Sequence, residues 1–163
     1  MEEAIFYKDQ DGSIYIRAQG HVTASICPEL KAKAFARLDA SPPPSAVYMD
    51  LGPCEYMDST FLGLIVGINK RFRLKSPSPV VLLHVNDTCR GLLKTIGVLK
   101  LVELSDADVA FPPIMDRLGP GPRATAEFLL DAHEELSELS AENRKRFSTL
   151  TDTLKSALGK NED

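Results

Sequence analysis

The sequence contains few cysteines, no long apolar run and no basic leader. Its three cysteines are widely spaced and form no C-x-x-C pair: Cys27, Cys54 and Cys89. An odd number at this spacing argues against a disulfide framework or a zinc site, and it indicates reduced thiols. No apolar stretch approaches about 18 residues, so we expect no transmembrane span. Because no basic segment precedes an apolar one at the N-terminus, we expect no signal peptide and a cytoplasmic protein.

Positive charge is also scarce. The 163 residues include 19 lysines and arginines against 23 aspartates and glutamates, which gives a net charge of −4. A nucleic-acid binder usually presents a basic face, whereas the densest basic cluster here consists only of Lys70, Arg71, Arg73 and Lys75. The composition therefore predicts one domain with an appendage that contacts other proteins rather than nucleic acid.

Catalytic motifs are absent from the sequence. It has no phosphate-binding loop, no dinucleotide-binding glycine pattern and no nucleophile elbow. The three histidines, His21, His84 and His133, fall in separate elements without metal-ligand spacing, and His84 is expected inside a strand. Since no nucleophile, base and orienting group can be assembled, we expect no enzyme activity, no metal and no cofactor.

Apolar residues alternate with polar ones in some segments and recur at helical spacing in others. Thr23 or Ser25 can cap the first helix, and Pro28 is tolerated in its first turn. The order β-β-α-β-α-β-α-β predicts an α/β fold, with a mixed, mainly parallel sheet of four to five strands and helices packed on it. The predicted strands are 4–8, 13–18, 46–51, 80–85 and 99–104, and the predicted helices are 23–39, 58–74 and 86–96.

The last third of the chain differs in composition. We predict a domain at 1–110, a linker rich in proline and glycine at 111–122, and an amphipathic arm at 123–163 formed by one helix or by two with a break. The arm either packs on its own domain or pairs with a second copy. Asn143 lies at a core-like position, where a polar residue sets the register of helix pairs. The predicted apolar stripe is Leu129, Ala132, Leu136, Leu139, Phe147, Leu150, Leu154 and Ala157.

The segment Met57-Asp58-Ser59-Thr60-Phe61-Leu62-Gly63 joins a buried strand to a helix. Regulatory and ligand sites gather at such strand ends. Asp58 can cap the helix, and Ser59 and Thr60 lie in its first turn, where unpaired N–H groups would accommodate a phosphate. From these residues alone, helix capping is the simpler explanation. Gly63 and Gly67 would let this helix approach the sheet or a partner closely.

The hairpin that ends at Gly20, the strand VYMDLGPCEYM and the sequence DSTFLG together resemble the STAS domain of anti-sigma factor antagonists, over roughly residues 4–104. In that family a motif like D-S-[ST]-G-L-G opens the second helix, and an anti-sigma factor that is also a serine kinase phosphorylates its first serine. The resemblance implies a STAS-like fold, phosphorylation of Ser59 with Thr60 as the alternative, and resetting by a serine/threonine phosphatase. The partner-binding residues that we expect are Asp58, Ser59, Thr60, Phe61, Gly63, His21 and Thr23.

Phe61 stands where the family motif has a glycine, and it is either a hydrophobic anchor for a partner or a core residue. Three functions follow from the sequence. The first is a phospho-switched antagonist in a bacterial partner-switching pathway that regulates a sigma factor. The second is a STAS scaffold in a larger signalling assembly, which forms a homo-oligomer through the arm. The third is a small-molecule or nucleotide-binding module, with Ser59 as a phosphate contact.

Overall fold

The computed structural model describes residues 1–119, 121 and 123–159. Pro120 and Pro122 of the predicted linker and residues 160–163 of the predicted arm lie outside the described residues. The strands of the described chain form one sheet in the order β6-β5-β3-β2-β1-β7, and β4 pairs with the far end of β2. These strands are β1 (Ala4–Gln10), β2 (Ser13–Val22), β3 (Ala46–Asp50), β4 (Cys54–Met57), β5 (Val81–Leu83), β6 (Glu103–Ser105) and β7 (Asp116–Leu118).

The sheet starts from an antiparallel hairpin of β1 and β2. Asp11 and Gly12 in its turn have φ values of 52° and 79°, the left-handed conformation that favoured two-residue hairpin turns require. Ile14, Ile16 and Ala18 are completely buried, because alternate side chains of a strand point to the same face. β2, β3, β5 and β6 then run parallel to one another. The predicted α/β fold with a mixed, mainly parallel sheet is confirmed.

The short strands differ from the prediction. The strand VYMDLGPCEYM is split into β3 and β4. β7 was not expected, and it lies inside the predicted linker, where it pairs with β1 and places Leu118 opposite Ile5. Residues 98–100 form a 3-10 helix and not the start of the predicted strand 99–104. The strand found there, β6, contains only three residues. His84 follows β5 instead of lying in it and has a positive φ of 57°. β6 and β7 show too little alternation of apolar and polar residues to be recognised in the sequence.

The helices of the described chain are α1 (Cys27–Asp39), α2 (Ser59–Arg73), α3 (Asp87–Ile96), α4 (Ala126–Ser137) and α5 (Ala141–Ala157). Pro28 lies in the first turn of α1, as predicted. The prediction that Thr23 or Ser25 caps this helix is wrong: a 3-10 turn precedes α1, whose N-cap residue, Ile26, makes no side-chain bond. The amide and hydroxyl of Thr23 instead donate to the Glu3 carboxylate, each at 2.6 Å.

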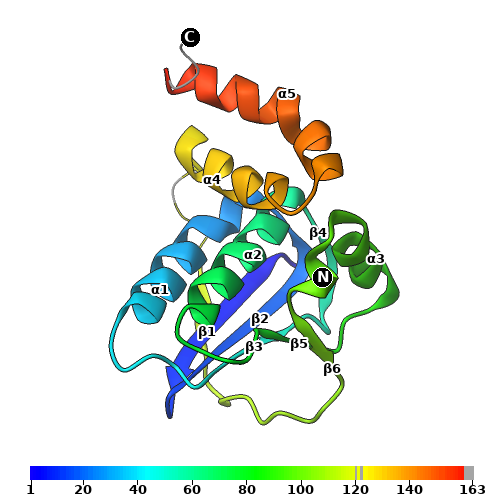
Figure 1. Ribbon diagram of the computed structural model, residues 1–163. Coiled ribbons are helices and arrows are strands. Elements are labelled where there is room, and N and C mark those ends of the chain that lie inside the picture. Colours follow the sequence, from blue (N-terminus) through cyan, green and yellow to red (C-terminus); the bar gives the residue numbers. More distant parts are fainter. Residues whose placement is uncertain (120, 122, 160–163) are drawn as a thin grey trace.

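α1 and α2 lie together on one face of the sheet, and α4 crosses the end at which α2 begins, with α5 on its outer side (Figure 1). Leu62, Ile65, Ile68 and Phe72, spaced three or four residues apart, are buried along α2. Every residue from 60 to 69 is buried as well, although a surface helix normally buries only one side. The reason is that the sheet covers one side of α2 while α1 and α4 cover others.

The C-terminal arm consists of two helices that pack on their own domain, which was one of the two predicted arrangements. Ser140 caps the second helix by accepting the amide of Asn143 at 3.0 Å. The predicted apolar stripe is wrong at Leu150, which is 39% exposed, and at Ala157, which is also exposed. The buried residues of the arm are Leu130, Ala132, His133, Leu136, Asn143, Phe147, Thr151 and Leu154. None of the described helices is both long enough and apolar enough to span a lipid bilayer.

Candidate functional site: the start of α2 beneath α4

Asp58 determines where α2 begins. It follows β4, and its Oδ1 accepts the amide of Phe61 at 2.9 Å, which confirms the predicted cap. Its Oδ2 accepts the amide of Ala24 at 2.9 Å. One carboxylate therefore ties the first turn of α2 to the segment that follows β2. Ser59, the first residue of α2, is half-buried at this junction.

The Ser59 hydroxyl is hydrogen-bonded to a histidine of the C-terminal arm. Its Oγ lies 2.7 Å from Nε2 of His133 in α4. The other ring nitrogen, Nδ1, lies 2.7 Å from the carbonyl oxygen of Leu129. Because a carbonyl can only accept, Nδ1 carries the proton, and in the neutral imidazole Nε2 accepts the Ser59 hydroxyl proton. The ring is 2% exposed and packs edge-on against Phe147, with the centroids 5.4 Å apart.

The sequence did not indicate the role of His133, because 74 residues separate it from Ser59. Its only signal is a histidine between Ala132 and Leu136 on the apolar side of a helix. The structure pairs a hydroxyl with an imidazole from two elements that are far apart in the sequence. Both side chains lie at the α2–α4 contact.

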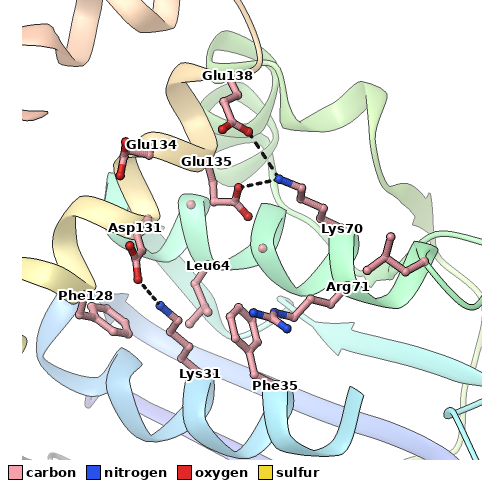
Figure 2. Close-up of a pocket in the computed structure, with 14 residues that line it drawn as sticks. Lys31, Phe35, Leu64, Lys70, Arg71, Phe128, Asp131, Glu134, Glu135 and Glu138 are labelled. Carbon is pink, nitrogen blue, oxygen red and sulfur yellow. Dashed lines mark hydrogen bonds and ion pairs between the residues drawn. The ribbon is translucent and has the colours of Figure 1, made fainter. Parts of the chain in front are cut away.

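A groove of about 540 Å³ runs beside this contact, between α1, α2 and α4 (Figure 2). Its walls carry opposite charges that pair across the helices. Lys31 of α1 lies 3.1 Å from Asp131 of α4, and Lys70 of α2 lies 3.3 Å from Glu135 and 3.5 Å from Glu138. Glu135, and then Glu138, raise the pKa of the Lys70 ammonium group. The charges of this groove thus join the arm to the domain, and neither Ser59 nor His133 lines it.

The other predicted partner-binding residues lie in different surroundings. Thr60 is 4% exposed and Phe61 is completely buried, so Phe61 is a core residue and offers no anchor to a partner in this conformation. Gly63 lies against the backbone of Ala132. His21 is exposed and stacks on Tyr56 of β4 with the ring centroids 5.7 Å apart. Thr23, which binds Glu3, is beside the Ala24 amide that Asp58 accepts.

The three cysteines are free and buried. The sulfurs of Cys54 and Cys89 lie 3.8 Å apart, beneath the loop that leads into α3. No group of three or more histidine, cysteine or acidic side chains is placed to hold a metal ion within the described ranges. The candidate site is therefore the hydroxyl of Ser59 together with its two neighbours, Asp58 and His133.

Solved structures of other proteins share this architecture, whereas no curated protein matches the chain. Among solved structures, the unphosphorylated anti-sigma factor antagonist SpoIIAA is 17% identical over 61% of this chain and 87% of its own, with a TM-score of 0.53. TM1081 of Thermotoga maritima is 20% identical over 62% and 85%, with a TM-score of 0.53. The phosphorylated form of Bacillus SpoIIAA is 16% identical over 61% and 90%, with a TM-score of 0.50. At these identities the likeness concerns the fold.

The family model of the STAS domain matches residues 5–109, which is most of the chain. The matched region contains β1 to β6 and α1 to α3, including the junction at Ser59. Helices α4 and α5 lie beyond it. This family is generally non-catalytic. The chain therefore belongs to the STAS-domain family, with two further helices placed over the start of α2.

Proposed function

We propose that this protein is an anti-sigma factor antagonist whose binding to a partner is switched by phosphorylation of Ser59. The observation that carries the proposal is the position of Ser59 as the first residue of α2, directly after the Asp58 cap, in a STAS domain. Its hydroxyl is hydrogen-bonded to His133 of an arm that lies outside the family region. The same junction carries the serine of the motif that the sequence resembles.

Phosphorylation would change the electrostatics of this junction. A phosphate adds nearly two negative charges at neutral pH. These charges would lie beside the Asp58 carboxylate, which already accepts two backbone amides. A partner that docks over unmodified Ser59 would then meet repulsion and would have to desolvate a dianion, so its affinity falls.

The partners that we propose are an anti-sigma factor that is also a serine kinase and a serine/threonine phosphatase that removes the phosphate. Unmodified, the protein binds the anti-sigma factor and releases the sigma factor. Phosphorylated, it loses that partner. Support comes from SpoIIAA, an anti-sigma factor antagonist whose structure is known in unphosphorylated and phosphorylated forms. The pathway would operate in the cytoplasm, without nucleic acid as a direct ligand.

Ser59 is favoured over Thr60 as the phosphorylated residue. The two are adjacent, but Thr60 is 4% exposed and faces the interior, whereas Ser59 is half-buried at the surface of the junction. A kinase could therefore reach Ser59 by displacing the arm, while Thr60 would require α2 itself to move. We propose Ser59 as the acceptor for this reason.

The two alternative functions have less support. A scaffold that oligomerises through the arm would need an unpaired apolar face, but Leu130, Leu136, Phe147 and Leu154 are already buried within one chain. A nucleotide-binding module would need Ser59 in a cavity, and the groove between α1, α2 and α4 does not include it. The scaffold remains an outcome of the experiments below.

The test begins with phosphopeptide mapping of the protein purified from its native cells under several growth conditions. We expect a phosphate on Ser59 whose occupancy changes with condition. The unmodified protein then serves as bait, and the kinase that it captures is purified for binding measurements. We expect Ser59→Asp to weaken that binding at least tenfold and Ser59→Ala to retain it, because only aspartate adds charge at the interface.

Thr60→Val is the matched control, since it replaces an adjacent, buried hydroxyl and should leave binding and phosphorylation unchanged. Equal affinity of all variants for the captured kinase, together with an unmodified Ser59 peptide in every condition, would reject the switch. A protein that sediments as an oligomer and is not phosphorylated in any condition would favour the scaffold.

A further inference from the structure

We propose that the hairpin of α4 and α5 is a built-in cover for the Ser59 surface, and that a partner protein can dock there only when this hairpin has moved away. The inference rests on the proposed function, since it concerns access of the kinase to Ser59. It adds a regulatory element that the family region does not contain, because both helices lie beyond residues 5–109.

The first observation is that α4 lies in direct backbone contact with α2. A Cβ atom on Gly63 would lie 2.7 Å from the carbonyl carbon of Ala132 and 2.9 Å from its Cα. Real Cβ atoms do not approach other atoms so closely. One turn further along α2, a Cβ on Gly67 would lie 3.3 Å from the Glu135 carboxylate. No side chain of a partner could enter between these helices while α4 is in place.

The second observation is that the Ser59 hydroxyl is already used. Its proton is donated to Nε2 of His133, and the proton on Nδ1 is held by the Leu129 carbonyl. A kinase has to bring its own base and its phosphoryl donor to the same hydroxyl. The hydrogen bond to His133 must break first, and since His133 is 2% exposed and packs against Phe147, it leaves Ser59 only if the hairpin shifts.

The third observation is that the contact has the character of a reversible interface. Two buried polar side chains of the hairpin hydrogen-bond to the domain: His133 to the Ser59 hydroxyl of α2 and Asn143 to the Ile96 carbonyl of α3. The ion pairs of Lys31 and Lys70 lie partly in solvent, where each contributes little. Polar contacts of this kind are typical of interfaces between domains that move relative to one another.

Binding then depends on the open fraction of the protein. The apparent affinity for a partner falls in proportion to the fraction of molecules that are competent to bind, so a hairpin open in about 1% of molecules weakens binding about 100-fold. A change that loosens the hairpin should raise access to residue 59 and phosphorylation of Ser59 by the same factor.

The test uses the full chain with Ser59→Cys as a reporter. The three native thiols are completely buried, so we expect only the new thiol at residue 59 to react. The probe is a maleimide attached to a polyethylene glycol polymer, which is too bulky to react beneath α4, and the rate is measured by gel shift. Phe147→Ala, which removes a buried ring from the contact with His133, should raise the rate at least about tenfold.

Two further variants complete the experiment. Leu150→Ala is the matched control, because it truncates an exposed leucine on the same helix and should leave the rate unchanged. Lys31→Glu places like charges opposite Asp131 without touching the core, so it should also raise the labelling rate. This variant replaces Phe147→Ala if Phe147→Ala proves too destabilising. The native thiols must stay unlabelled in each variant, which shows that the domain remains folded.

Three results would overturn the cover: labelling of the parent at the rate of a free cysteine, labelling only together with the native thiols, or no effect of either loosening variant. In a second experiment, the kinase that the unmodified protein captures is used to phosphorylate chains that retain Ser59. We expect a faster rate for Phe147→Ala than for the wild type and for Leu150→Ala. Equal rates reject the cover alone, whereas absence of phosphorylation in every variant rejects both proposals, whatever the labelling shows.

Discussion

Asp58 connects two parts of the chain through opposite oxygens of one carboxylate. One oxygen accepts the Phe61 amide and the other accepts the Ala24 amide. A hydrogen bond to a charged acceptor is stronger than a neutral one. The position of Ser59, and hence of any phosphate on it, depends on this single side chain.

Replacing Asp58 with alanine should therefore destabilise the protein more than loss of an ordinary cap. We expect Asp58→Ala to lower the free energy of unfolding by about 2 to 3 kcal/mol, because two amides lose an acceptor. Thr125→Ala is the matched comparison: Thr125 caps α4 through one bond, to the Phe128 amide at 3.0 Å, and its loss should cost about 1 kcal/mol. Urea denaturation measures both, and equal losses would contradict the double role of Asp58.

Single residues were predicted only where their role is local. Asp58 was recognised as a cap because the acceptor and the amide are three residues apart. His133 was not recognised, because its partner lies 74 residues away and depends on how α4 packs. Thr23 was misjudged as a cap because the competing Glu3 carboxylate precedes β1, 20 residues away along the chain. A helix cap can be predicted from the sequence, whereas the competition of distant side chains for the same hydroxyl cannot.

At the scale of elements, α2 is the helix on which the other parts converge. The sheet, α1 and α4 all pack on it, and it is buried continuously from residue 60 to residue 69. Its glycines make this possible, since Gly63 admits the backbone of α4. The close approach was expected from the Gly63 and Gly67 spacing, but it was expected with the sheet or with a partner, whereas α4 of the same chain makes it.

Two glycine-to-alanine changes should separate packing from helix propensity. Alanine is about 1 kcal/mol more favourable than glycine in a helix interior. Gly91→Ala in α3, where a Cβ would have no neighbour within 4 Å, should therefore raise the free energy of unfolding by up to about 1 kcal/mol. Gly63→Ala should lower it by about 1 to 3 kcal/mol, because the new methyl collides with Ala132. Urea titration of both variants decides, and a stabilising Gly63→Ala would show that α4 is not in contact.

The long helices and the hairpin were predicted well because their periodicities extend over many residues. The break between α4 and α5 was an open alternative, and Ser140 with its cap to Asn143 decides it. β4, β6 and β7 were missed or misplaced because each is held by pairing with a neighbour rather than by its own pattern. Elements of three or four residues belong to the tertiary structure more than to the local sequence.

At the scale of the whole molecule, one continuous core extends from the sheet to the arm. The core that contains Ile14, Met49 and Leu82 of the sheet also includes Leu136 and Phe147 of the hairpin. The alternation of strands and helices was sufficient to predict the class of fold. It could not place the arm, since an amphipathic helix fits any apolar surface and only the shape around Gly63 selects this one.

The thiols report on this core, because each belongs to a different element: Cys27 to α1, Cys54 to β4 and Cys89 to α3. Burial raises the pKa of the Cys27 thiol, and the Asp58 and Glu3 carboxylates raise it further. We expect no thiol of the reduced native protein to react with a small aromatic disulfide reagent at pH 8. In urea all three should react together, along the same curve as the loss of circular dichroism. Early reaction of one thiol would show that the core opens in parts.

The edge strand β7 has a consequence for how the hairpin competes with other proteins. Leu118 is fixed to β1, and only seven residues separate it from the first residue of α4. A ligand on so short a tether has an effective concentration on the order of millimolar at its own surface. That value stays the same however few copies the cell makes, because each copy carries one hairpin. A partner can displace the hairpin only through a higher concentration or a higher affinity. The fraction of this protein that is bound therefore depends on the concentration of the partner and not on the concentration of this protein.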